Sequence, residues 1–600
     1  MCGITAYCGC HEALPFLIQG LSKLEYRGYD SAGVTTIENN HLLTVKCKGR
    51  LSHLEDKLQN YHIHGHVGIG HTRWATHGIP SNLNSHPHTN EKETISLVHN
   101  GIIENYRELK EELIQKGYQF QSETDSEVVV QLLDFYYQGN LLEATKKVLG
   151  RIEGSYALCI ISTFEPDQVI VAKKDSPLII GKTQEGYVAA SDIPALLEYT
   201  KDVYFLEDKE IAILKEDSIQ FFAEDFNEIQ KEMTQIPYDI ESAKKDGYDT
   251  FMLKEIHEQP HVINETLRGR INHEQIILNE LDNIDFTIFN KVYYVACGTA
   301  YHASLCGSQV LERITKLPVI TNVASEFRYN DPLVDDKTLA IFVSQSGETA
   351  DTLAALRLAK DRGATTIAIA NVLGSTISRD ADYVLYTCAG PEIAVASTKA
   401  YTTQLVLLIL LAYYIGQRLN KTIDHEVIQQ LNLIPQYVEN ILKDEKQFEQ
   451  YALMLKDLHD AYFIGRSLDY ASVLEGALKL KEVSYVHADA YVAGELKHGP
   501  IALIEDGSVV IAVATQPIVA AKTVSNIQET IARGAQVILF TTKQNHIKNI
   551  ENTYYLPDIT PTLQTILVAI PLQLIAYYTA KFKGCDVDKP RNLAKSVTVE

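Results

Sequence analysis

The sequence predicts an α/β protein of several domains. Its 600 residues are more than a single hydrophobic core holds. The first ~235 residues are rich in short runs of β-forming residues, such as 155–162 and 168–173, which alternate with turns and a few helices. A polar, charged stretch at 236–247 follows, and we expect it to be a linker. Beyond it the pattern strand, Gly/Ser turn and helix repeats, which predicts parallel sheets with helices on both faces.

The second half contains an internal duplication. An apolar strand at 292–296 runs into a glycine turn and a helix, and 461–464 does the same about 170 residues later. Likewise, the strands at 339–343 and 509–513 each precede a polar turn and a helix. Because ligands of doubly wound sheets bind at the carboxyl ends of the strands, both turns are candidate sites. Only the first is rich in hydroxyl groups.

That first turn has the composition of a phosphate site. Ser344, Ser346 and Thr349 supply three hydroxyls, Gln345 adds an amide, and Gly347 permits close approach of a ligand. The backbone N–H groups and the positive end of the following helix point to the same place. The turn therefore predicts an anion site without lysine, consistent with a sugar phosphate. The alternative is that the hydroxyls only cap the helix.

Composition and charge favour small-molecule ligands. The chain has 46% hydrophobic and 22% charged residues, as ordinary globular proteins do. Its formal charge of −23 disfavours a general nucleic-acid-binding surface, because such surfaces are basic. An acidic protein can still hold an anionic substrate in a local pocket of N–H groups and a few cations. We expect no nucleic-acid partner.

The sequence does not suggest secretion or membrane insertion. Its nine cysteines are sparse and odd in number, which fits a reducing cytosol better than a disulfide framework. No signal peptide is visible at the start. Of the longest apolar runs, 405–415 is short for a bilayer, and 565–578 is interrupted by Pro571 and Gln573. We expect both to be buried core helices, with no membrane partner, in a soluble cytoplasmic protein.

Cysteine at position 2 predicts an N-terminal nucleophile. If Met1 is removed, Cys2 carries both a thiol and a free α-amine. The amine has an ordinary pKa of about 7.7–8.0, so it can take a proton from the thiol or from a tetrahedral intermediate near neutral pH. No separate histidine is then required. Taken alone, an ordinary cysteine near the start of a strand remains the alternative.

Other residues of the first half supply what a thiolate needs to cleave an amide. The Asn100 side chain and the Gly101 backbone N–H are candidate donors to an oxyanion. Arg73 can pair with a substrate carboxylate, and Asp125 with a substrate ammonium. Individually these residues could form a surface ion pair, a hairpin turn and a helix cap. Together with Cys2, they predict a site that holds glutamine at both ends of its amino-acid moiety.

These motifs identify a resemblance. The first half resembles the N-terminal-nucleophile glutamine amidotransferases. End to end, the chain is similar to the family of glutamine–fructose-6-phosphate aminotransferases (isomerising), also called glucosamine-6-phosphate synthases. The stretches that carry the resemblance are 1–4, 25–31, 71–78, 344–349, 395–399, 494–500 and 588–600. One departure is Ala300, where the family commonly has serine; the missing hydroxyl contact, unless water replaces it, costs about 1 kcal/mol.

The resemblance implies a fold and an activity. The fold would be an α/β chain with an αββα four-layer N-terminal-nucleophile glutaminase followed by two doubly wound, flavodoxin-like αβα SIS (sugar isomerase) subdomains. The reaction would make glucosamine 6-phosphate and glutamate from D-fructose 6-phosphate and L-glutamine, the first step towards UDP-GlcNAc. Ammonia would pass internally between the sites, and no cofactor or metal is implied. The expected segments are a glutaminase at 2–238, a linker and entry at 239–282, SIS subdomains at 283–425 and 450–588, and a catalytic tail at 589–600.

The resemblance also implies which residues act. The catalytic residues would be Cys2, Asn100, Gly101, Lys479, Glu482, His498 and Lys595. The glutamine-binding residues would be Arg73, Thr76, His77 and Asp125. The sugar-phosphate-binding residues would be Thr299, Ser344, Gln345, Ser346, Thr349, Val395 and Ser397.

In the family, the residue that matches Lys595 forms a Schiff base with C2 of the sugar, and the residue that matches Glu482 moves a proton between C1 and C2, assisted by Lys479. His498 would open the sugar ring from the partner subunit, which implies a homodimer. Trp74 would gate the ammonia channel. Without the resemblance, Lys595 is an exposed tail lysine, Glu482 and Lys479 belong to a solvated ion-pair ladder, and Trp74 is a core residue.

A metal site is disfavoured. His62, His64 and His66 alternate as on one face of a strand, but Gly65 interrupts them and no cysteine or acidic ligand completes a set. The pair at Cys8 and Cys10 has no usual metal-site spacing. Two rival functions remain: another amidotransferase with the same glutaminase, and a non-catalytic sugar-phosphate-binding regulator built on the SIS pair. The regulator leaves Cys2, Glu482 and Lys595 without roles.

Overall fold

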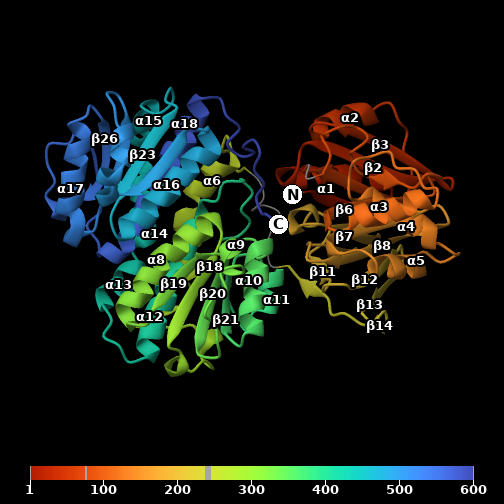
Figure 1. Ribbon diagram of the computed structural model, residues 1–600, viewed down its shortest axis with the longest axis horizontal. Helices are drawn as coiled ribbons and strands as arrows, with labels where there is room; N and C mark the ends of the chain where they lie inside the picture. The colour runs from red at the N-terminus through yellow and green to blue at the C-terminus, as the bar shows by residue number, and fades with distance from the viewer. Residues whose placement is uncertain (1, 75–76, 237–244, 599–600) are drawn as a thin grey trace. The chain divides into compact units, whose positions relative to one another are not determined.

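A computed structural model describes residues 2–74, 77–236 and 245–598. The chain forms two compact units (Figure 1). The first contains Met1–Ala243 together with the C-terminal segment Ala594–Glu600, and the second contains Lys244–Leu593.

Two antiparallel sheets form the centre of the first unit. One has eight strands in the order β15-β11-β9-β10-β1-β4-β2-β3. Their bounds are β1 Gly3–Gly9, β2 Ser31–Glu38, β3 His41–Lys48, β4 Val67–Arg73, β9 Ile179–Thr183, β10 Gly186–Ala190, β11 Asp202–Phe205 and β15 Thr234–Gln235. The other has seven strands in the order β14-β13-β12-β8-β7-β6-β5. Their bounds are β5 His88–Thr89, β6 Ile95–Ile103, β7 Gly154–Ser162, β8 Glu165–Lys174, β12 Ile211–Lys215, β13 Ile219–Phe222 and β14 Glu228–Ile229.

The two sheets pack face to face and carry helices on their outer faces. Alternate residues of the strands meet in one apolar layer, for example Ile4 and Ile69 from the first sheet with Val98, Cys159 and Val171 from the second. Helices α1 (Ala13–Leu24) and α2 (Leu51–Leu58) cover the eight-stranded sheet. Helices α3 (Tyr106–Gln115), α4 (Glu127–Tyr136) and α5 (Leu141–Leu149) share a core with the other sheet. This is the αββα arrangement that the resemblance implied.

The second unit confirms the duplication. It contains two five-stranded parallel sheets, β19-β18-β20-β21-β22 and β24-β23-β25-β26-β27. Numbered from its own first strand, each sheet has the order 2-1-3-4-5, which is the flavodoxin-like doubly wound order. The bounds are β18 Lys291–Ala296, β19 Val319–Val323, β20 Thr338–Ser344, β21 Thr365–Ala370, β22 Tyr383–Tyr386, β23 Asp460–Gly465, β24 His487–Val492, β25 Val509–Ala514, β26 Gln536–Thr542 and β27 Asn552–Leu556.

Each strand–turn–helix unit lies where the sequence predicts it. In the first copy, β18 leads into α8 (Gly298–Thr315) and β20 into α10 (Ala350–Asp361). In the second copy, β23 leads into α16 (Leu468–Ser484) and β25 into α17 (Pro517–Ile531). The helix predicted to follow the hydroxyl-rich turn begins at Ala350. The turns therefore stand at the carboxyl ends of the first and third strands of each sheet.

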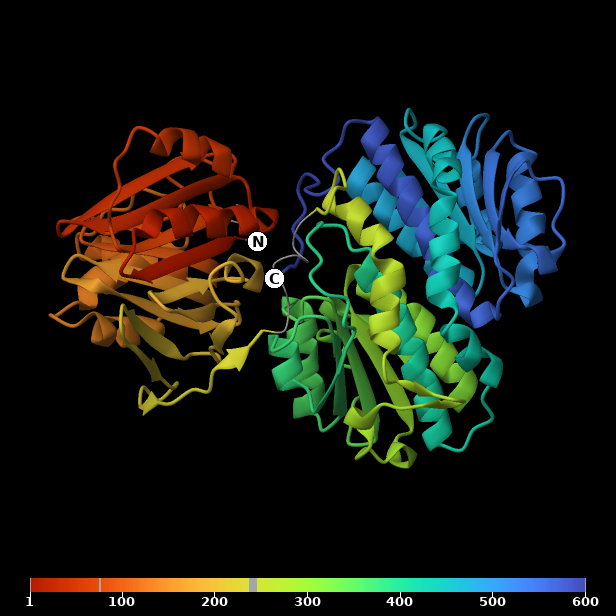
Figure 2. The same ribbon diagram turned by 180° about the vertical axis from the view of Figure 1, so that it is seen from behind.

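Both long apolar runs are core helices, as expected. They form α12 (Lys399–Arg418) and α18 (Gln564–Phe582). By length and composition alone either could cross a membrane, but their apolar windows are 94% buried inside the protein. Pro571 does not interrupt α18, which continues through it. The two helices that open the second unit, α6 (Phe251–His257) and α7 (Gln259–Leu267), pack against α18 and against α12 and α14 (Ile434–Lys443), respectively (Figure 2).

Gln573 is a buried polar residue in α18 and is expected to be a stability determinant. Its Nε2 donates to the Thr398 carbonyl at 3.1 Å, and its Oε1 accepts from Gln259 Nε2 at 2.9 Å. Gln573→Ala removes both hydrogen bonds from the core, although Gln259 Nε2 still donates to the Ile256 carbonyl at 2.9 Å, so the second unit should lose about 1–3 kcal/mol of unfolding free energy. Urea unfolding followed by circular dichroism measures this loss. Gln429→Ala, on the exposed surface of the same unit, is the control and should change it by less than about 0.5 kcal/mol.

Candidate active sites

Cys2 lies directly before β1, which is a central strand of the first unit's eight-stranded sheet. Its Sγ accepts a hydrogen bond from the Trp74 backbone N–H at 3.2 Å. Its carbonyl oxygen accepts from Asn100 Nδ2 at 3.0 Å and from Arg27 Nε at 3.2 Å. Burial raises the pKa of the Cys2 thiol, against the opposing positive charges of Arg73 and Arg27. A thiol held protonated in this way needs a base before it can attack, which is the task assigned to a free α-amine.

Arg27 is buried and holds the Cys2 carbonyl. It lies within the stretch 25–31 that carries the resemblance, but the sequence alone indicated no role for it. Its guanidinium pairs with Asp192 at 2.9 Å, and the Tyr26 hydroxyl donates to the same carboxylate at 2.6 Å. Arg27 is only 5% exposed, so the ion pair is screened little by solvent. The Arg27–Asp192 pair therefore fixes the position of the Cys2 carbonyl. The contacts among Cys2, Arg27 and Asp192 could not be predicted from the sequence, because these residues are far apart in it.

Asn100 and Gly101 lie in β6, beside Cys2. Gly101 has a φ of +125°, and a Cβ at that position would stand 2.1 Å from the Ser155 carbonyl oxygen. Only glycine fits there. The structure thus brings both predicted oxyanion donors into the strand that faces the nucleophile.

Arg73 ends β4 and is 3% exposed. Its Nη2 donates to the carbonyls of His77 and, at 3.1 Å, Gly78, whereas its buried Nη1 has no hydrogen-bond partner among the described residues. A buried guanidinium nitrogen without an acceptor suits a substrate carboxylate. Burial lowers the pKa of Arg73, and the negative charges of groups such as Asp125 oppose this effect.

The other predicted glutamine-binding residues are placed as follows. Asp125 is buried, and its Oδ2 accepts the Ile103 N–H at 2.8 Å. The His77 ring packs edge-on against Tyr106, with 5.4 Å between ring centroids. Thr76 lies outside the described residues. The Trp74 ring is partly buried and meets Tyr29 edge-on at 5.8 Å.

Four buried histidines lie behind the nucleophile, and sequence reasoning gave them no role. His71 stacks on His86 with 4.2 Å between ring centroids, and His86 meets His88 at 4.5 Å. His88 Nε2 pairs with the Thr124 hydroxyl at 3.0 Å, and His99 Nδ1 with Ser126 Oγ at 2.8 Å. Burial lowers the pKa of His71 to about 3 and lowers those of the other three as well. All four are therefore neutral near pH 7.

This cluster should make the first unit acid-labile. In the unfolded chain these histidines titrate near pH 6.5, so below that pH the unfolded state binds protons that the native state refuses. Above about pH 6.5 protonation of these histidines does not reduce the free energy of unfolding. As the pH drops further toward the native pKa values, that free energy should fall by about 1.4 kcal/mol per pH unit for each such histidine. Fluorescence of Trp74, the only tryptophan, measures urea unfolding of this unit at each pH.

His88→Gln provides the matched comparison, because glutamine keeps a polar group near the Nε2 position that faces Thr124. The variant should have a pH slope shallower by about one proton. Equal stability of the wild type at about pH 7.5 and about pH 5.5 would contradict the assignment of these rings as neutral.

In the second unit, the predicted phosphate turn follows β20. Ser344 Oγ accepts the Gly347 N–H at 3.0 Å and lies 3.3 Å from the Thr349 hydroxyl. Ser346 Oγ accepts the Glu348 N–H at 3.2 Å. Gly347 has a φ of +68°, and a Cβ there would stand 2.2 Å from Ser375 Oγ. Thr349 is the N-cap residue of α10, yet its side chain makes no capping hydrogen bond, so capping alone does not explain this hydroxyl.

Helix α16 carries charged side chains that are largely buried. They do not form the solvated ion-pair ladder that was the alternative expectation for Lys479 and Glu482. Lys479 is 1% exposed and pairs with Glu482 and, at 3.5 Å, with Glu475. Burial alone would lower the pKa of Lys479, but these two carboxylates outweigh it and raise the pKa above its ordinary value. Glu475 also accepts from the Thr299 hydroxyl at 3.0 Å and contacts His302 Nδ1 at 2.8 Å. The Thr299 hydroxyl, expected to face phosphate, thus donates to Glu475 in this structure.

The remaining predicted residues lie on loops or, for His498, at the end of a short 3₁₀ segment. Val395 precedes α12, is buried, and donates its N–H to the Asp588 carbonyl at 3.1 Å. Ser397 is in the same loop and is partly buried. His498 is exposed at the end of a 3₁₀ segment, Ala493–His498. Lys595 is partly buried and belongs to the first compact unit.

Asp588 anchors the start of the predicted tail. Its carboxylate accepts the N–H groups of Phe251 and Met252, at 3.0 and 2.9 Å, at the beginning of α6. Through its own carbonyl it holds Val395. Ala300, at the position where the family commonly has serine, lies in the first turn of α8. It is partly buried and packs against the core.

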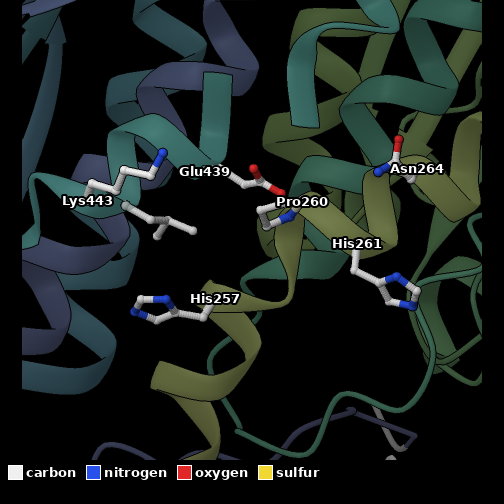
Figure 3. Close-up of a pocket in the computed structure, with 7 residues that line it drawn as sticks. His257, Pro260, His261, Asn264, Glu439 and Lys443 are labelled. Atoms are coloured by element: carbon white, nitrogen blue, oxygen red, sulfur yellow. The ribbon is translucent and has the colours of Figure 1, made fainter. Parts of the chain in front are cut away.

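A cavity of about 550 Å³ lies beside α7 and α14 in the second unit (Figure 3). His257, His261 and Asn264 line it on one side and Glu439 and Lys443 on the other. None of the predicted site residues lines it. Among the described residues, no group of three or more His, Cys, Asp or Glu side chains is arranged to hold a metal ion. In the region considered for metal binding, His64 pairs with Glu12 and His66 with the His11 carbonyl.

Comparisons with known proteins agree with this arrangement. The SIS domain family matches residues 288–414 and 454–581, and the glutamine amidotransferase domain family matches 36–237. The chain is 54% identical over 610 residues to the glutamine–fructose-6-phosphate aminotransferase [isomerizing] of Clostridium tetani, with all of both chains covered. It is 46% identical over 607 residues to the protein of that name from Thermococcus kodakarensis, again over the whole of both chains. The solved C-terminal domain of glucosamine-fructose-6-phosphate aminotransferase from Francisella tularensis covers 57% of this chain and 99% of its own, at 39% identity and a TM-score of 0.56.

Proposed function

The chain belongs to the family of glutamine–fructose-6-phosphate aminotransferases (isomerising), and from that premise we propose how its residues divide the reaction. The enzyme makes glucosamine 6-phosphate and glutamate from fructose 6-phosphate and glutamine. The observation that carries the residue assignment is the placement of the Cys2 carbonyl against Asn100 Nδ2, which puts an amide donor beside the thiol.

The first unit cleaves glutamine. With Met1 removed, the Cys2 α-amine takes the thiol proton, and the thiolate attacks the side-chain amide carbon. Asn100 Nδ2 and the Gly101 N–H stabilise the oxyanion. The protonated amine then gives its proton to the departing nitrogen, which leaves as ammonia, and water hydrolyses the thioester to release glutamate. Arg73 Nη1 and Asp125 hold the carboxylate and ammonium of the substrate, with Thr76 and His77 beside them.

The second unit and the tail convert the sugar. His498 opens the ring, and the Lys595 amine condenses with the C2 ketone to form a Schiff base with loss of water. Ammonia displaces the lysine from C2. Glu482 then takes a proton from C1 and returns it to C2, which leaves an aldehyde at C1 and an amine at C2. Lys479 assists these proton transfers.

The phosphate is held by the turn after β20. Ser344, Gln345, Ser346 and Thr349 supply its donors, together with the N-terminal end of α10. Thr299 joins them through its backbone N–H or after its hydroxyl rotates away from Glu475, and Val395 and Ser397 bind the sugar hydroxyls. The Thr349 side chain supports this assignment, because it does not cap α10 and lies beside the Ser344 hydroxyl in the same turn.

Thr349→Val tests the phosphate assignment. The substitution keeps the shape and removes one donor to a dianion, so KM for fructose 6-phosphate should rise by about tenfold or more. Glutamine hydrolysis without sugar should not change. Thr352→Val in the same helix is the control, because Thr352 is buried and its hydroxyl donates to Cys297 Sγ at 3.9 Å. An unchanged KM in the Thr349 variant would remove this residue from the phosphate site.

Two further assignments concern assembly. The enzyme is a cytoplasmic homodimer in which His498 completes the sugar site of the partner subunit, and Trp74 gates the passage of ammonia. The proposed segments are a glutaminase at 2–238, a linker at 239–282, SIS subdomains at 283–425 and 450–588, and a catalytic tail at 589–600. The exposed position of His498, the last residue of the 3₁₀ segment Ala493–His498, supports its contribution to another subunit.

Mixing two inactive variants tests the shared site. Glu482→Gln and His498→Ala should each be inactive as homodimers. A mixed dimer has one complete site, so random reassembly of equal amounts should recover about a quarter of the wild-type rate. If the mixture stays as inactive as either parent, both residues act within one subunit. The reaction itself is tested by following amide-labelled glutamine nitrogen into glucosamine 6-phosphate.

A further inference from the structure

The orientation of the Asn100 side-chain amide is fixed by a backbone group. The atom of this amide that lies 3.0 Å from the Cys2 carbonyl must be the nitrogen, because a carbonyl oxygen only accepts hydrogen bonds. The other end, Oδ1, therefore points away from Cys2. It lies 3.1 Å from Nε2 of His71.

The tautomer of His71 follows from this orientation. Its Nε2 faces two acceptors, Asn100 Oδ1 and the His99 carbonyl, both at 3.1 Å. Nε2 must therefore carry the hydrogen. The ring is fully buried and its Nδ1 has no partner among the described residues. His71 is thus a neutral donor that does not change its charge in the working pH range.

The position of the ring is fixed by packing. His71 lies in β4 of one sheet and Asn100 in β6 of the other, so their hydrogen bond crosses the interior of the sandwich. His86 stacks on the His71 ring at 4.2 Å with 18° between the planes. The His86 Nδ1 in turn accepts the His99 backbone N–H at 3.3 Å. The stack restricts rotation of the His71 ring.

We propose that His71 is a positioning residue for glutamine cleavage, which holds the Asn100 amide with its nitrogen toward the oxyanion. The amide nitrogen has two hydrogens: one is donated to the Cys2 carbonyl, and the other remains for the substrate. Without the donor on His71, Asn100 Oδ1 loses a buried partner, and the amide no longer has a preferred orientation. His71 touches neither substrate nor thiol in this assignment. The inference rests on the proposed role of Asn100 as an oxyanion donor.

A pair of neutral substitutions tests the proposal. Glutamine places an amide nitrogen near the position of the imidazole Nε2, whereas asparagine reaches only the Nδ1 position. His71→Asn should lower kcat for glutamine hydrolysis by about 10- to 100-fold, approaching the effect of losing one oxyanion donor, with little change in KM. His71→Gln should restore most of that activity. Ammonia-dependent synthesis should be unchanged in both.

Three controls decide the outcome. His88→Gln alters another buried ring of the same cluster, which contacts His86 and Thr124, and keeps a polar group toward Thr124, so it should retain hydrolysis; an equal loss there would show a general packing effect and overturn the proposal. Trp74 fluorescence reports whether each variant folds. Adding His71→Asn to Asn100→Ala should cause no further loss, because both act on one donor.

Other outcomes are equally definite. Full hydrolysis by His71→Asn, additive losses in the double variant, or His71→Gln as impaired as His71→Asn would each overturn the positioning role. Full hydrolysis by Asn100→Ala would instead refute the proposed oxyanion donor. The failure of this inference and the failure of the proposed function are thereby distinguished.

Discussion

Cys2→Ala is expected to abolish glutamine hydrolysis and glutamine-dependent synthesis. The variant removes the only atom proposed to attack the amide, and losses of a catalytic nucleophile reach about 10⁴-fold or more. Ammonia-dependent synthesis should continue at close to the wild-type rate, because the residues proposed to act on the sugar are untouched. Rates with glutamine and with ammonium salt, measured side by side, give both values.

The control for this variant is Cys10→Ala, which replaces an exposed free cysteine near the same chain end and should leave both activities intact. Mass spectrometry of the wild-type protein should find a chain that begins at Cys2. Glutamine hydrolysis that survives in Cys2→Ala removes the thiol from the mechanism. Full activity with Met1 still attached removes the α-amine as the base.

Lys595→Arg is expected to stop amino-sugar formation from either nitrogen source. A guanidinium keeps the positive charge but stays protonated and does not form a Schiff base. The loss should be about 10³-fold or more, since a covalent intermediate is removed and not merely a contact. Glutamine hydrolysis in the absence of sugar should persist.

Reduction with borohydride in the presence of fructose 6-phosphate gives a direct readout. The wild type should gain the mass of the reduced sugar on the peptide that contains Lys595, and the variant should gain none. Lys589→Arg, in the same tail, is the matched control and should still be labelled at Lys595. Labelling of the Lys595 variant at another lysine would transfer the Schiff base to that residue.

The fold was predictable where it depended on local pattern. Apolar strands followed by glycine or serine turns located β18, β20, β23 and β25 and their helices, because side-chain periodicity and turn chemistry are local properties. Pro571 marked the limit of such reasoning. A proline within an apolar run indicates an interruption, yet α18 continues through it, because burial of the whole helix outweighs one lost backbone hydrogen bond.

The residue types of the candidate sites could be predicted from the sequence, but the contacts between those residues could not. Residue types alone indicated a thiol, an oxyanion donor and cations in the first half. The contact between Arg27 and Cys2, the salt bridge from Arg27 to Asp192, and the bond from Thr299 to Glu475 join residues far apart in sequence. No periodicity or motif spacing encodes such pairs.

The sequence by itself determined which reactive groups and which elements are present: a cysteine behind the initiator methionine, a hydroxyl-rich turn between a strand and a helix, and a duplicated sheet. The tertiary structure decided how those groups are held. It buried Lys479 between two carboxylates and oriented the Asn100 amide between a backbone carbonyl and His71. The physical reason is that charge state and hydrogen-bond direction depend on burial and on partners brought together only by folding.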